Sequence, residues 1–357
     1  MKHRGFLYLA AFVALILAVG LACAGSAAPT ATAIPPASAP TLPPAPANTP
    51  QPSGPFQLDT TRYTHRSGAF SFYPPKGWKL DESDVNAFYS PADQKGAVEV
   101  NVTNTGYTLD EQSFENFVRN SEDNFFAGRD QYIEQNFKAD AATKTITVKK
   151  TFLFSNVTQV VVSVYHQEGQ AIYAAHFWAD KDVADAYHAI YEDILNGLTL
   201  NSKPVVNMSA YAFTYTFTGP NSLFTIDVPT AWSYSSDTSV QYFVIDTFLS
   251  PDGHAAIQNI MYDDGTKVAG KDLAQFALNI LNQNYSSGGG VKVSEEKQQP
   301  DGSDRLTWTT RQGGLSGITF IELRGTAALM FSVLYDDPYT DAYLPVLNTT
   351  IGSYNVP

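Results

Sequence analysis

A motif that occurs twice constrains this chain more than any other feature. The segment 70–78 reads FSFYPPKGW, and the segment 224–232, which lies 154 residues later, reads FTIDVPTAW. In each copy, alternating apolar residues predict a short strand, a proline ends it, and a tryptophan follows the turn. A chain with such an internal repeat is expected to fold as two copies of one unit.

The repeat extends well beyond this motif. Residues 88–91 (FYSP) match 248–251 (FLSP), and residues 185–187 (DAY) match 341–343 (DAY). The offset between matching residues drifts only from 154 to 160 over more than a hundred positions. We therefore interpret the two segments as diverged copies of one ancestral unit.

The apolar pattern predicts the same order of elements in both copies: a strand pair, a helix, a run of strands and a closing helix. The first copy is expected to have a helix opening at 109–111 and three strands at 144–154, 158–166 and 171–179. The second copy is expected to have four strands, at 291–298, 305–311, 318–323 and 327–335. The closing helices are expected at 183–195 and 339–351, and Pro345 predicts that the second is short or kinked.

This layout resembles the PsbP-type fold, a family that includes the extrinsic photosystem II oxygen-evolving protein and many bacterial lipoproteins. The residues most specific to the resemblance are Phe70, Pro75, Trp78, Phe224, Pro229 and Trp232. The resemblance implies an α+β protein with two tandem PsbP-like α/β/α sandwich domains, at 58–201 and 208–357, each a mainly antiparallel sheet flanked by helices. These six are packing residues, so they imply a fold and transfer no activity. We expect each copy to close its own hydrophobic interior.

The first 22 residues have the pattern of an export signal. Lys2 and Arg4 precede an uncharged, mostly apolar run from residue 5 to residue 22. The sequence around Cys23, VGLACAG, resembles a bacterial lipobox, which implies cleavage after residue 22 and lipidation of Cys23. The expected location is the extracytoplasmic side of the cell membrane. The alternative is that residues 5–22 remain as a transmembrane helix, because 18 residues are near the lower limit for spanning.

A proline-rich segment separates this signal from the repeats. Residues 24–56 contain ten prolines, and no charged residue occurs between Arg4 and Asp59. Proline fixes φ and lacks a backbone donor, so neither a helix nor a strand is expected. We predict a disordered, polyproline-like linker over 23–57 that acts as a spacer.

Charge and composition exclude several classes of function. The net charge of −13 disfavours binding to nucleic acid, whose phosphates it would repel. Cys23 is the only cysteine, so an internal disulfide and a cysteine-based metal site are both excluded. The sequence also lacks closely spaced histidine pairs and a Gly-x-Ser-x-Gly motif. We predict no cofactor and no catalytic residues.

The predicted function is a non-enzymatic binding or scaffolding module of the bacterial envelope, with an envelope protein or a glycan as its partner. Two copies on one anchor would permit bivalent binding. The alternative is a solute- or glycan-binding lipoprotein that serves a transporter. Separately, Tyr165, Tyr173, Trp178 and Trp308 are candidates to line a carbohydrate or peptide groove. Such aromatic residues are more often core residues. An enzymatic role would require carboxylates that converge from distant positions.

Overall fold

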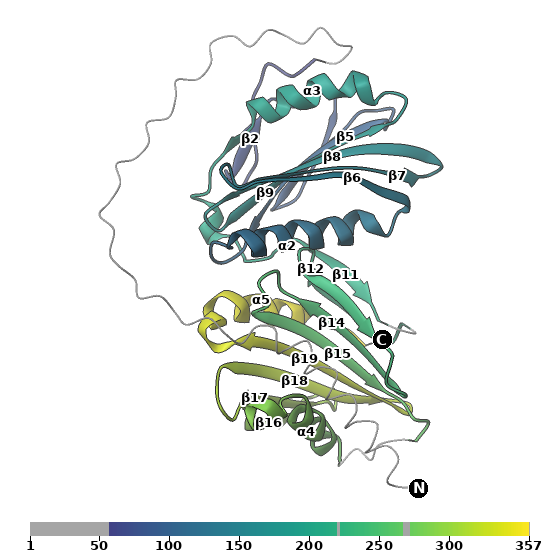
Figure 1. Ribbon diagram of the computed structural model, residues 1–357, viewed down its shortest axis with the longest axis vertical. Helices are drawn as coiled ribbons and strands as arrows, with labels where there is room; N and C mark the ends of the chain where they lie inside the picture. Colours follow the sequence, from purple (N-terminus) through teal and green to yellow (C-terminus); the bar gives the residue numbers. More distant parts are fainter. Residues whose placement is uncertain (1–56, 220–221, 267–271, 357) are drawn as a thin grey trace, which may run out of the picture. The chain divides into compact units, whose positions relative to one another are not determined.

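Two seven-stranded antiparallel sheets make up most of the structure (Figure 1). The computed structural model describes residues 57–219, 222–266 and 272–356. The first sheet contains β3 (Lys79–Glu82), β4 (Asn86–Ser90), β5 (Gly96–Asn104), β6 (Asp130–Asp140), β7 (Thr145–Phe154), β8 (Val157–Glu168) and β9 (Ala171–Asp180). The second contains β13 (Ser233–Asp237), β14 (Phe243–Leu249), β15 (Ala255–Tyr262), β16 (Val291–Gln298), β17 (Asp304–Thr310), β18 (Leu315–Arg324) and β19 (Ala327–Asp336).

The two sheets have the same strand order. The first runs β3-β4-β5-β9-β8-β7-β6, and the second runs β13-β14-β15-β19-β18-β17-β16. The turns also agree, because Gly169 between β8 and β9 and Gly325 between β18 and β19 have left-handed φ angles of 61° and 62°. Glycine adopts this conformation without steric cost. The prediction of an α+β protein built from two tandem copies of one fold is therefore confirmed.

Each sheet lies between two helices. Helices α2 (Glu111–Glu122) and α3 (Ala184–Gly197) cover opposite faces of the first sheet, and α4 (Leu273–Asn284) and α5 (Thr340–Ser353) cover those of the second (Figure 1). A π-helix (Asp123–Ala127) continues α2. Short strands form two further sheets, β1 (Tyr63–Thr64), β2 (Phe70–Phe72) and β10 (Thr199–Leu200) in one and β11 (Thr214–Thr218) and β12 (Thr225–Pro229) in the other.

The side-chain alternation of a strand explains this layering. Along β9, Ile172 and Ala174 belong to the apolar cluster that includes α2, whereas Tyr173 and Phe177 belong to the cluster that includes α3. All nine residues of the neighbouring strand β5 are buried, as expected for a strand covered on both faces. The helices are therefore held by the two faces of one sheet.

The helix boundaries agree with the sequence pattern except at one proline. Asp110 caps α2 by accepting a 2.8 Å hydrogen bond from the backbone N–H of Ser113. Pro345 was expected to shorten or kink the last helix; it does not shorten it, because α5 runs for 14 residues with Pro345 inside it. Burial of Tyr343 and Leu347 on the same helix offsets the one backbone hydrogen bond that proline removes.

Several strands were not expected from the sequence, and β6 is the longest of them. Strand β6 is 11 residues long and forms the edge of the first sheet, and most of its residues are exposed. Its pairing with β7 is interrupted by two shifts in register. An exposed, irregular edge strand carries polar residues and so lacks the apolar alternation by which strands are recognised.

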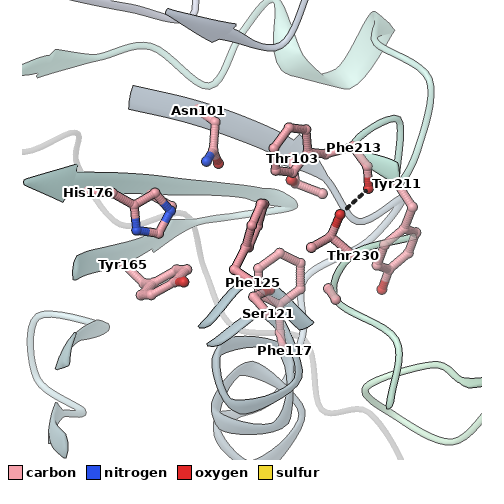
Figure 2. Close-up of a pocket in the computed structure, with 12 residues that line it drawn as sticks. Asn101, Thr103, Phe117, Ser121, Phe125, Tyr165, His176, Tyr211, Phe213 and Thr230 are labelled. Carbon is pink, nitrogen blue, oxygen red and sulfur yellow. Dashed lines mark hydrogen bonds between the residues drawn. The ribbon is translucent and has the colours of Figure 1, made fainter. Parts of the chain in front are cut away.

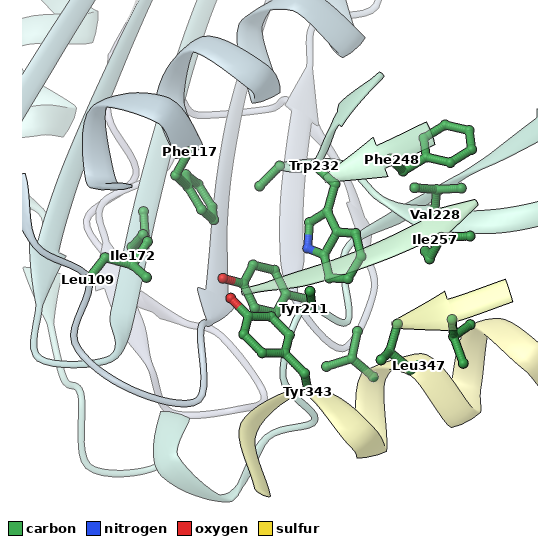
Figure 3. Close-up of a cluster of buried hydrophobic side chains, with 14 of the residues drawn as sticks. Leu109, Phe117, Ile172, Tyr211, Val228, Trp232, Phe248, Ile257, Tyr343 and Leu347 are labelled. Atoms are coloured by element: carbon green, nitrogen blue, oxygen red, sulfur yellow. The ribbon is translucent and has the colours of Figure 1, made fainter. Parts of the chain in front are cut away.

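The expectation that each repeat closes its own interior holds for only one face of the first sheet. The apolar cluster on the α3 face, against which Trp78 packs, lies within the first repeat, whereas the cluster on the α2 face continues into the second repeat. Residues 54–357 form one compact unit, and a single apolar cluster spans both repeats. Phe117 of α2 and Ile172 of the first repeat belong to it together with Trp232 and Leu347 of the second (Figure 3). Helix α2 provides the connection, because it packs on its own sheet with one side and contacts the second repeat with another.

Candidate functional site

The six residues of the repeated motif occupy equivalent places but are not equally buried. Phe70, Pro75, Phe224, Pro229 and Trp232 are buried. Trp232 is completely buried between Tyr211 and Tyr343, with ring centroids 6.1 Å and 5.9 Å away. Trp78 is only half-buried and packs on Tyr187 of α3 at 5.7 Å. These residues pack in two separate places, and Cys23 lies outside the described residues.

A row of asparagines on α2 and the π-helix joins the two repeats. Asn116, Asn120 and Asn124 are four residues apart and therefore lie along one side of the helical segment. Their side-chain amides donate to backbone carbonyls of the second repeat. The acceptors are Pro251 (2.8 Å), Ala231 (2.9 Å), and, for Asn124, both Thr230 (2.7 Å) and Trp232 (2.8 Å).

The hydrogen bonds from α2 and the π-helix explain why the turn before Trp232 is buried more deeply than the equivalent turn before Trp78. Thr230, Ala231 and Trp232 form the turn that follows β12, so the Pro-x-x-Trp turn of the second repeat is also its contact with α2. The first repeat has the same turn, but its Trp78 packs at the edge against Tyr187. Sequence reasoning missed this role. The spacing of four between the asparagines was the signal that could have indicated it.

A second set of contacts lies at the other end of α2. The backbone carbonyl of Asn104 accepts from the N–H of Tyr211, and the Asn104 amide donates to the carbonyl of Met208, both at 2.8 Å. The hydroxyls of Tyr107 and Tyr343 lie 3.2 Å apart, and Tyr343 donates to Asp252 at 2.8 Å. The repeats are thus joined by polar bonds around an apolar centre.

Removing the amide of Asn124 should loosen this interface. Asn124→Ala leaves two partly buried carbonyls without their donor, which costs about 1–3 kcal/mol of unfolding free energy. Chemical denaturation followed by far-UV circular dichroism measures this loss. The control is Asn196→Ala on the exposed side of α3. An equal effect of the two substitutions would mean that the Asn124 bonds do not hold the interface.

A buried polar cluster lies beneath the end of α2. The Lys150 ammonium bonds the carboxylate of Glu122 and donates to Ser163 Oγ at 2.7 Å. Ser163 Oγ lies 2.7 Å from His176 Nδ1, and Tyr165 donates to the other oxygen of Glu122 at 2.8 Å. These five residues come from α2, β7, β8 and β9, and each is at most 2% exposed.

Burial dominates the electrostatics of this cluster. Desolvation lowers the pKa of Lys150 to about 8, although the negative charge of Glu122 acts to raise it. Desolvation also lowers the pKa of His176 well below its usual value, and the Lys150 charge adds to the effect. The imidazole is therefore neutral at physiological pH. The pKa of Tyr165 is raised by burial and by Glu122.

A lysine, a serine and a histidine in contact resemble a nucleophile with its base, but the cavity beside them is too small for a substrate. The cavity beside His176 and Tyr165 holds about 10 Å³, room for one water at most (Figure 2). Phe213 and Thr230 of the second repeat lie across this cavity (Figure 2). We therefore assign the cluster to the positioning of α2, which carries the asparagine row.

The remaining candidates from the sequence do not form a site together. Tyr165 and Trp308 are buried core residues, with Trp308 donating to Thr319 at 3.0 Å, and Trp178 is half-buried. Within the described ranges, no three histidine, aspartate or glutamate side chains are grouped as metal ligands. None of the helices in the described part of the chain has the length and apolar character needed to cross a membrane.

Comparisons with known proteins show only remote similarity. No family model and no curated protein matches this chain. The solution structure of cyanobacterial PsbP from Synechocystis sp. PCC 6803 has 10% identity and a TM-score of 0.32, covering 40% of this chain and 92% of its own. A Bacteroides thetaiotaomicron protein has 9% identity and a TM-score of 0.30, with 74% and 87% covered. The T6SS immunity protein TplEi of Pseudomonas aeruginosa has 10% identity and a TM-score of 0.22, with 79% and 97% covered.

Proposed function

We propose that this protein is a non-enzymatic binding or scaffolding module of the bacterial envelope, anchored by lipid on Cys23 and carried on a proline-rich stalk. We further propose that its repeats are PsbP-type domains, on the basis of the repeated Pro-x-x-Trp turn. The module presents its two repeats to a partner as one rigid body. The observation that carries this proposal is the row of asparagine bonds from α2 to the second repeat, around a shared apolar cluster.

This arrangement changes the expected mode of binding. In bivalent binding, two equivalent surfaces engage two equivalent targets through independent domains. Here the α2 side of the first repeat is packed against the second repeat, so the two copies expose different surfaces. A partner protein or glycan would therefore contact a composite surface of fixed geometry. We propose one partner per module.

Capture from envelope extract tests this proposal. Residues 54–357 are immobilised as wild type, as Asn124→Ala and as the control Asn196→Ala, and the retained components are identified by mass spectrometry. We expect one defined component on the wild type and on the control, and clearly less on Asn124→Ala. Equal retention on a loosened Asn124→Ala variant would contradict recognition of a rigid composite surface.

The anchor is tested separately. Cys23→Ser removes the sulfur that would carry the lipid. Once the export signal at residues 1–22 is cleaved, no apolar segment remains to hold the protein in the membrane. We expect the variant in the soluble exported fraction, measured by fractionation and immunoblotting. Retention in the membrane fraction would instead mean that residues 5–22 stay as a transmembrane helix.

A second candidate is the solute- or glycan-binding lipoprotein of a transporter. It is favoured by one observation, an open groove of about 300 Å³ in the first repeat. A groove of this size is at the lower end of those that hold small ligands.

A further inference from the structure

The two repeats differ in packing at one equivalent position on the helix-covered face of the sheet. In the first repeat, Val164 of β8 lies opposite Ala175 of β9. In the second, Phe320 of β18 lies opposite Phe331 of β19, each 156 residues later in the chain. The two phenylalanine rings are stacked with centroids 6.1 Å apart. The same backbone position thus holds two small side chains in one copy and two rings in the other.

In the second repeat, the ring of Tyr354 fills the rest of the space beside these two phenylalanines. Tyr354 follows α5 as Leu198 follows α3, again 156 residues later. Its ring stacks on Phe331 at 4.4 Å with an angle of 3° between the planes. In the first repeat no ring replaces it, because Leu198 occupies that place.

Because the side chains at these positions are smaller in the first repeat, an open groove remains on this face of its sheet. It measures about 300 Å³ and lies between β7–β9 and the residues that follow α3. Its apolar wall consists of Val164, Ala175, Leu195, Leu198 and Leu200. A closed apolar cavity of about 150 Å³ takes up benzene, so this groove has room for a larger ring system. Leaving such a surface in water is unfavourable, at about 25 cal/mol per Å².

One end of the groove carries neutral hydrogen-bonding groups. Thr145, His166 and Tyr173 form a row across β7, β8 and β9, and Thr145 Oγ1 lies 3.3 Å from His166 Nδ1. Burial lowers the pKa of His166, which keeps its imidazole uncharged, and burial raises the pKa of the Tyr173 hydroxyl. The lining therefore contains donors and acceptors but no carboxylate and no ammonium group.

We infer that this groove binds a small, uncharged aromatic molecule that carries a hydroxyl or carbonyl group. The second repeat shows the chemistry that fits, because phenyl rings and the phenol ring of Tyr354 occupy the equivalent place. Thr145 and His166 would bond the polar group of the ligand, because the hydroxyl of the neighbouring Tyr173 is buried. This inference names a site for the solute-binding candidate, and it does not depend on the scaffolding role.

The second repeat also supplies the test. Val164→Phe/Ala175→Phe transfers its two rings into the first repeat and should fill the groove. The probes are 1-naphthol as the neutral aromatic alcohol, 1-naphthoate as its charged analogue and 1-decanol as an aliphatic alcohol. Isothermal titration calorimetry on residues 54–357 measures their affinities. We expect wild type to bind 1-naphthol at least tenfold more tightly than the other two, and the filled variant to bind it at least tenfold more weakly than wild type.

A milder variant guards against misfolding. Leu198→Tyr introduces only the third ring, at a partly exposed position, and should also weaken 1-naphthol binding severalfold. No binding of 1-naphthol by the wild type, or equal binding by folded wild-type and filled proteins, would overturn the site. Tighter binding of 1-decanol than of 1-naphthol would overturn the aromatic class. Capture of an envelope partner by the filled variant would leave the scaffolding proposal standing in either case.

Discussion

Lys150→Met should lower the free energy of unfolding by about 3–5 kcal/mol, because it leaves the Glu122 carboxylate buried without its partner. Both side chains are almost completely buried, so water cannot replace the lost ammonium. Urea denaturation of residues 54–357 measures the effect. Lys149→Met, at an exposed position on the same strand, is the matched control and should change stability by no more than about 0.5 kcal/mol.

A double variant separates the charge from the packing. In Lys150→Met/Glu122→Gln, the buried charge is gone and the amide oxygen can still accept from Tyr165. We expect this protein to be more stable than Lys150→Met alone, which is the behaviour of a coupled buried pair. Additive losses from the two substitutions would show that the ion pair is not what stabilises the end of α2.

Trp232→Ala should lower the free energy of unfolding by about 3–5 kcal/mol, the range for truncation of a fully buried aromatic residue. Trp78→Ala should cost only about 1–2 kcal/mol, because that ring is half-buried at the edge of its repeat. The unequal effect follows from the role of the Trp232 turn as the contact with α2. Urea denaturation gives both values.

The same pair of variants reports on the coupling between the repeats. Loss of Trp232 should raise amide hydrogen exchange in α2 as well as in the second repeat, whereas loss of Trp78 should act mainly on the first. Equal costs for the two substitutions, or exchange confined to the second repeat after Trp232→Ala, would contradict the shared interior.

The fold was predictable from the sequence because the repeat provided two independent examples of one pattern. Alternating strands such as β8 and the capped start of α2 at Asp110 follow from local chemistry. Strand β6 was missed because an exposed edge strand with polar residues has no apolar period, although comparison with the strand expected at 291–298 would have indicated it. Pro345 does not shorten α5, because tertiary burial outweighs the loss of one backbone bond.

The site residues were harder to predict for a different reason. The contacts of Lys150 and Glu122 join residues 28 positions apart through the sheet and helix, and no local pattern indicates them. The groove depends on volumes at Val164 and Ala175 that matter only after the strands are paired. Alignment of the two copies could have indicated it, because both positions hold phenylalanine in the second repeat.

The central claim is that one apolar cluster joins the α2 face of the first repeat to the second repeat, so that both repeats behave as one rigid body. Differential scanning calorimetry of residues 54–357 tests it most directly. The account predicts a single transition whose calorimetric and van't Hoff enthalpies agree, and a transition that broadens or splits in Asn124→Ala. Two separate transitions in the wild-type protein would contradict it.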